Sequence, residues 1–91
     1  MIRRQNRGDQ VRLTFVLPND AEFGAVSVVG DFNEWTPGAH PLVKRSNGTR
    51  SAVVAVPPGT ELRFRYLGEG GRWFDDEDAD GHDHHGGLLR T

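Results

Sequence analysis

ELRFRYL, residues 61–67, alternates apolar side chains with charged ones. Successive side chains of a β-strand point to opposite faces, so this period of two predicts a strand with one buried and one charged face. The apolar face comprises Leu62, Phe64 and Tyr66, and the charged face carries Arg63 and Arg65. Pro57-Pro58-Gly59 precedes the stretch and a glycine-rich turn at 68–71 follows it. These turn residues limit the strand to this length, and its two aromatic residues are assigned to the core.

Further short strands are expected on both sides of this stretch. VRLTFVL, residues 11–17, shows the same alternation, and Asn47-Gly48 accepts the positive φ of a tight hairpin turn. The expected strands are 11–17, 25–30, 41–45, 51–56, 61–67, 72–74 and 88–89. No window of ten or more residues has helical periodicity. The predicted fold class is therefore all-β, an antiparallel sandwich of six or seven short strands.

The chain has 91 residues, enough for one domain and too few for two. It contains no cysteine, which excludes a disulfide framework and thiolate chemistry. No apolar run approaches the roughly 20 residues of a membrane helix. The amino terminus, MIRRQNRGDQ, has no apolar stretch after its basic residues and does not read as a signal peptide. We expect a soluble, cytoplasmic protein with no membrane partner.

The net charge of −2 is unevenly distributed, with basic residues at the amino terminus and acidic ones between 75 and 83. Residues 1–10 are predicted to form a flexible basic arm, residues 11–91 the sandwich, and residues 75–87 a mobile acidic, histidine-rich loop. Their opposite charges favour attraction between arm and loop. A nucleic-acid site needs basic side chains gathered on one face with aromatic ones between them, and the arm is too short for that. No nucleic-acid partner is expected.

VVGDFNEW, residues 28–35, begins as an apolar strand, continues as a run of turn residues and ends on a tryptophan. Four residues are assigned to building the turn: Gly30, Asp31, Phe32 and Asn33. Asparagine and aspartate close such turns through side chain to backbone hydrogen bonds, and the phenylalanine is expected to point inward onto the core. Trp35 is then either an exposed aromatic platform or a loop residue folded onto Pro37 or Pro41.

With these stretches in place, the chain resembles the glycogen-binding module of the beta subunit of AMP-activated protein kinase. It is also similar to the amino-terminal early-set domain of isoamylase and glycogen-branching enzymes. Three motifs carry the resemblance: G-x-F-N-x-W at 30–35, P-P-G at 57–59 and G-x-W-x-x-D at 71–76. It covers about Leu13 to Asp80. The resemblance implies an immunoglobulin-like, early-set β-sandwich that is non-catalytic and binds α-1,4-linked glucans, such as glycogen or a maltooligosaccharide.

The resemblance also implies three sugar-binding residues: Trp35, Trp73 and Arg65. The tryptophans match the two stacking tryptophans of the kinase module, and Arg65 falls near its hydroxyl-binding lysine. Aromatic rings suit the apolar C–H face of glucose, and directional donors suit its hydroxyl rim. Judged from the residues alone, Trp73 also fits a core aromatic, and Arg65 a solvated charge on a strand face.

The chain departs from this family in its last segment. The family carries a sugar-binding asparagine there, whereas this chain has no asparagine after Asn47. His84 or His85 is the candidate replacement. The alternative function is an early-set sandwich that has lost its sugar face and binds a protein partner through its arginine-bearing face or its acidic loop.

The acidic, histidine-rich loop also contains metal-ligand residue types. Asp76–Gly81 matches the first half of an EF-hand calcium loop, but position twelve is Gly87 where a glutamate is needed. His82, His84 and His85 are zinc-ligand types, yet ordering three of them in one flexible loop costs much entropy. The carboxylates crowd this loop, with no separated pair of the kind an acid and a nucleophile form. No metal, no other cofactor and no enzymatic activity is therefore predicted.

Overall fold

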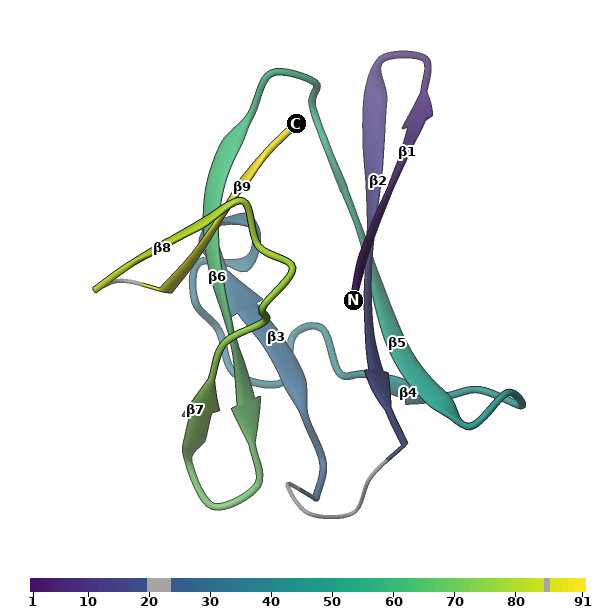
Figure 1. The fold of residues 1–91 in the computed structure, drawn as a ribbon, viewed down its shortest axis with the longest axis vertical. Coiled ribbons are helices and arrows are strands. Elements are labelled where there is room, and N and C mark those ends of the chain that lie inside the picture. Colours follow the sequence, from purple (N-terminus) through teal and green to yellow (C-terminus); the bar gives the residue numbers. More distant parts are fainter. Residues whose placement is uncertain (20–23, 85) are drawn as a thin grey trace.

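A computed structural model describes residues 1–19, 24–84 and 86–91. In these residues the chain forms two antiparallel sheets that face each other (Figure 1). One sheet contains, in spatial order, β1 (Ile2–Arg7), β2 (Gln10–Pro18), β5 (Thr49–Val56) and β4 (Val43–Lys44). The other contains β3 (Ser27–Gly30), β6 (Glu61–Gly68), β9 (Gly86–Arg90) and β8 (Gly81–Asp83), with β7 (Arg72–Phe74) paired to β6. The predicted all-β, antiparallel sandwich is confirmed.

The core lies between the two sheets and is built from the period-two faces of the longest strands. Leu13 and Phe15 of β2 and Phe64 and Tyr66 of β6 are fully buried. The ring centroids of Phe15 and Phe64 are 5.0 Å apart, within the range of a favourable aromatic pair. The predicted inward face of residues 61–67 is confirmed, including the assignment of both aromatic residues to the core.

The amino terminus differs from the prediction of a flexible arm. Ile2–Arg7 forms strand β1, which pairs with β2 along its whole length from Ile2–Phe15 to Arg7–Gln10. Gly8 and Asp9 make the two-residue turn between them, with Gly8 at a φ of 67°. A Gly-Asp turn is a hairpin signal. The strand lies at the sheet edge and is largely exposed, so its side chains do not alternate between apolar and polar. Its sequence therefore does not predict a strand.

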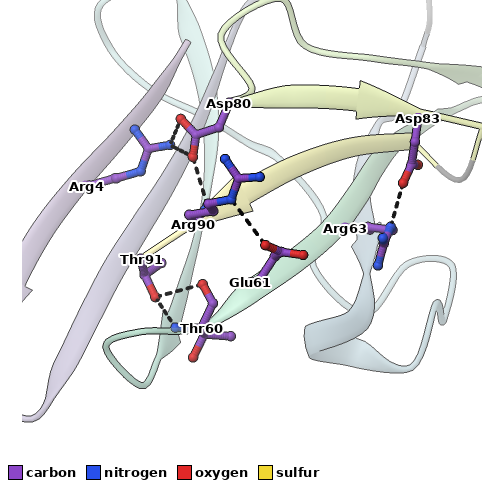
Figure 2. Close-up of polar contacts among 8 residues, drawn as sticks. All are labelled: Arg4, Thr60, Glu61, Arg63, Asp80, Asp83, Arg90 and Thr91. Carbon is purple, nitrogen blue, oxygen red and sulfur yellow. Dashed lines mark hydrogen bonds and ion pairs between the residues drawn. The ribbon is translucent and has the colours of Figure 1, made fainter.

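The acidic segment also differs from the mobile loop predicted at 75–87. It contains β8 and the start of β9, which pair as a hairpin; residue 85 lies outside the described part of the chain. Asp76 is only 5% exposed. Arg4 of β1 binds both carboxylate oxygens of Asp80 at 2.8 Å, which joins the two sheets (Figure 2). The expected attraction between the basic and acidic segments is thus present, as an ion pair in a folded arrangement.

None of the described residues belongs to a helix that is long and apolar enough to cross a membrane.

The Tyr66 hydroxyl donates a hydrogen bond of 2.7 Å to Asp76 inside the sandwich. Burial raises the pKa of Asp76, but the hydrogen bonds from Tyr66 and from the Asp78 backbone N–H outweigh it, so the net pKa is lowered. A carboxyl group whose pKa is lower in the folded state stabilises the fold above its unfolded pKa of about 3.9, and this contribution is lost as pH falls through the folded pKa.

We therefore expect Tyr66→Phe to lower the free energy of unfolding at pH 7 by about 1.5–3 kcal/mol, the range for hydrogen bonds to charged groups. The difference in free energy of unfolding between Tyr66→Phe and the original protein should become smaller below about pH 4. Asp76 is then protonated and is no longer stabilised as a carboxylate by the hydrogen bond from the hydroxyl. Urea denaturation followed by circular dichroism at several pH values measures this. A difference that is independent of pH would contradict the role given to Asp76.

Candidate functional site

An open groove with a volume of about 490 Å³ lies on the outer face of the five-stranded sheet. The described side chains that line it are Asp31, Trp35, Arg63, Arg65, Trp73 and His84. All three residues that the sequence nominated for sugar binding are in this set. Strand β6 provides the floor, because its arginines point away from the core. The remaining residues come from the turns after β3 and β8 and from β7.

The pairing of β6 explains why the two tryptophans meet at one groove. β3 and β7 both pair with the carboxyl-terminal half of β6, so they lie on its two sides. Trp73 is opposite Leu67, and therefore on the same face as Arg65. Trp35 lies five residues after the end of β3, on the side of β6 opposite to β7. The two indoles thus flank a strip of arginine side chains.

The turn that carries Trp35 is tightly specified. β3 ends at Gly30, and a Cβ there would lie 2.4 Å from the carbonyl oxygen of Arg63, so a larger side chain would force the backbones apart. The Asn33 side chain accepts a hydrogen bond from Gly30 N–H at 3.0 Å, as expected for a turn-closing asparagine. Phe32 in the short helix η2 (Asp31–Asn33) packs its ring 5.9 Å from that of Phe15 in the core.

Glu34 and Trp35 follow in the left-handed backbone region, with φ values of 55° and 56°. This conformation costs roughly 1–2 kcal/mol for a residue with a side chain. The Trp35 backbone N–H donates to the Gly30 carbonyl at 3.0 Å and so closes the turn. Trp35 is half-buried at the groove wall. Strained backbone of this kind is often retained where it places a functional side chain.

Asp31 differs from its predicted role of capping its own turn. Its Oδ1 accepts a hydrogen bond from Trp35 Nε1 at 3.0 Å, and its Oδ2 accepts one from the backbone N–H of Arg63 at 2.9 Å. The carboxylate therefore joins the indole to strand β6. Nothing in the local sequence indicates the second of these contacts, because Arg63 lies 32 positions away.

Trp73 is 44% exposed, so the alternative reading as a core aromatic is wrong. The guanidinium carbon of Arg65 lies 5.9 Å from the centroid of the Trp73 ring, within the range of a cation–π contact. Arg65 Nε also donates to Asp75 at 3.1 Å. This ion pair at Nε holds the arginine over the indole, and the two terminal nitrogens keep N–H donors for further hydrogen bonds.

Two further residues line the groove, Arg63, which was not nominated from the sequence, and His84, which was named there as a candidate replacement for the family asparagine. Arg63 Nε donates to Asp83 at 2.9 Å (Figure 2), and this hydrogen bond, with the attraction of the same carboxylate, raises the pKa of Arg63. Its place was readable from the sequence, since it shares the charged face with Arg65. His84 lies at the groove, whereas His85, the other proposed replacement for the family asparagine, lies outside the described residues.

The predicted metal-ligand types do not gather into a metal site in the described part of the chain. Within 1–19, 24–84 and 86–91, no three histidine, aspartate or glutamate side chains are arranged to hold an ion. Asp76 bonds Tyr66, and the His82 ring lies 2.9 Å from the Asp76 carbonyl. The ligand types of this segment mainly make structural contacts.

The comparison with known proteins finds partial similarity to glucan-branching enzymes. The chain is 46% identical over 57 residues to the 1,4-alpha-glucan branching enzyme GlgB of Deinococcus radiodurans, which is 62% of this chain and 8% of that enzyme. It is 41% identical over 54 residues to the same enzyme of Salinibacter ruber, 58% of this chain and again 8% of the enzyme. No family model matches the chain. The chain is thus similar to a small part of two enzymes named for 1,4-alpha-glucan branching.

Proposed function

We propose that this protein is a non-catalytic module that binds α-1,4-linked glucan in the groove on the five-stranded sheet. Trp35 and Trp73 would stack on the apolar faces of glucose units, and Arg65 would donate to their hydroxyl groups. The observation that carries the proposal is the groove itself, which gathers these three side chains from separate segments. The partial similarity to two 1,4-alpha-glucan branching enzymes supports the same class of ligand.

The chemistry of the groove fits a neutral sugar better than a charged ligand. Both groove arginines are paired with a carboxylate, Arg63 with Asp83 and Arg65 with Asp75. Much of their positive charge is therefore compensated, while N–H donors remain for hydroxyl groups. Indoles offer a large, rigid surface with two side-chain torsions to fix. Apolar area with a few oriented donors is the usual composition of a small-molecule site.

The proposal that the module is non-catalytic rests on the same side chains. The groove carboxylate of Asp31 accepts hydrogen bonds from an indole and a backbone amide, and it has no second carboxylate among the described lining residues. Glycosidic cleavage or transfer ordinarily uses a pair of carboxyl groups flanking the bond. The groove therefore suits binding.

The test is a titration of the protein with maltoheptaose, followed by tryptophan fluorescence and by calorimetry. A saturable change is expected with maltoheptaose and none with cellohexaose, which is also built from glucose. Two indoles on opposite sides of the groove would suit a bent α-1,4 chain better than a flat β-1,4 chain. Absence of any saturable change at millimolar maltoheptaose would refute the proposal.

The alternative, a protein-interaction module, is favoured by one observation on the opposite sheet. Val43 and Val53 are 51% and 44% exposed, and both lie on the outer face of the four-stranded sheet. Exposed apolar side chains that gather on one sheet face are candidates for contact with a protein partner. A protein that fails to bind maltoheptaose while keeping its fold would favour this alternative.

A further inference from the structure

The Asp31 carboxylate connects the Trp35 indole, which forms a wall of the groove, to strand β6. We propose that Asp31 is a positioning residue, which holds the Trp35 ring in the orientation that forms one wall of the groove. The inference rests on the proposed function for its link to sugar, but the positioning itself can be measured without sugar.

The register of the sheet shows why a side chain is needed at this point. β3 pairs with β6 from Ser27–Leu67 to Gly30–Phe64, and there β3 ends and the chain turns into η2. The next backbone N–H along β6, that of Arg63, donates to Asp31 Oδ2 at 2.9 Å. The carboxylate thus continues the hydrogen bonding of the sheet where the strand stops. Because β6 pairs with β3, β7 and β9 and buries three side chains in the core, Asp31 is anchored to a rigid element.

The other carboxylate oxygen of Asp31 accepts a hydrogen bond from the indole, so the ring is also tied to β6. Trp35 Nε1 donates to Asp31 Oδ1 at 3.0 Å, a charge-assisted hydrogen bond of good length. Trp35 itself stands at the end of a turn of two left-handed residues, where its backbone alone does not fix the ring. A ring that is already oriented loses less conformational entropy when a ligand packs on it. The contact therefore preorganises the groove.

Trp73 has no corresponding carboxylate contact at its indole N–H among the described residues. It lies on a strand paired with β6, with the Arg65 guanidinium over its ring. Its indole N–H has no hydrogen bond to a side chain or backbone group of the described residues. The two indoles of one molecule thus form a built-in comparison, with one clamped by a carboxylate and the other held by its strand.

The first experiment records the two indole N–H signals by nuclear magnetic resonance in the absence of sugar. Asp31→Ala should move the Trp35 indole signal and speed its exchange with water, while the Trp73 signal stays in place. In Asp31→Asn the Trp35 indole signal should stay close to its original position and exchange rate, because the amide oxygen can still accept a hydrogen bond from the indole. Glu34→Gln, which removes a charge from the same turn, is the matched control and should leave both signals unchanged. An unmoved Trp35 signal in Asp31→Ala would overturn the positioning role.

The second experiment measures maltoheptaose affinity in the same variants. Asp31→Ala should weaken binding about fivefold, the loss expected for one net hydrogen bond, and Asp31→Asn should recover part of it. Glu34→Gln should bind as the original protein does. If the original protein binds and Asp31→Ala binds equally well, the inference fails. If the original protein does not bind, the proposed function fails, and the resonance experiment still decides whether Asp31 fixes the indole.

Discussion

Replacing Trp35 by alanine is expected to weaken maltoheptaose binding by about 30-fold or more, equivalent to about 2 kcal/mol. The indole is one of the two aromatic walls of the groove, and its loss removes the stacking surface together with the partner of Asp31. Trp73→Ala should have an effect of similar size, because Trp73 is the more exposed wall. Calorimetry gives the dissociation constants directly.

Fluorescence adds a check, because the chain has two tryptophans and each variant leaves the other as the reporter. Val43→Ala is the matched control, since Val43 is exposed and belongs to the other sheet, which contributes no side chain to the described lining of the groove. It should bind maltoheptaose as the original protein does. Retention of full affinity by both tryptophan variants, with the original protein binding, would place the sugar elsewhere on the molecule.

The largest expected effect on stability comes from Phe15→Ala. Phe15 is fully buried, and its ring lies 5.0 Å from that of Phe64 and 5.9 Å from that of Phe32. Truncation of a buried phenylalanine costs about 3–5 kcal/mol, whereas a whole domain is stable by about 5–15 kcal/mol. The variant should therefore lose a large share of its free energy of unfolding. Urea denaturation followed by circular dichroism measures the loss.

Val53→Ala is the control for this substitution. Val53 lies on the same sheet, opposite Thr14 and next to Phe15 in the pairing, but it is 44% exposed. Its truncation should cost less than about 1 kcal/mol, because little buried area is removed. Equal losses in the two variants would mean that the aromatic cluster is not the core of the sandwich. Phe15→Ala should also loosen the Trp35 turn, since Phe32 loses the ring on which it packs.

Strands that carry apolar side chains or lie between clear turn residues could be predicted from the sequence, whereas β1 and β8 could not. Residues 72–74 were expected as a strand and form β7 with the same bounds, and residues 61–67 form β6 with one residue added. β1 and β8 carry mostly exposed polar side chains, so no period of two marks them. Both depend on pairing with a neighbour, which local sequence does not contain.

The candidate site divides in the same way. Trp35 and Trp73 could be nominated from their motifs and Arg65 from the family resemblance, and the structure brings all three to one groove. The contact of Asp31 with the Arg63 backbone N–H of β6 could not be predicted, because the two residues are remote in the sequence. A turn-forming aspartate looks the same in sequence whether it caps its own turn or, as in this structure, bonds an indole and a neighbouring strand.

The sequence by itself determined the strand faces and the turn, because the period of two and the chemistry of glycine and asparagine act over a few residues. It placed Phe64 and Tyr66 in the core and Arg65 outside it. Only the tertiary structure decided that Trp35 and Trp73 share a groove. That decision depends on β3 and β7 lying on the two sides of β6 in fixed register, and a shift of one residue in either pairing would turn its side chains to the opposite face.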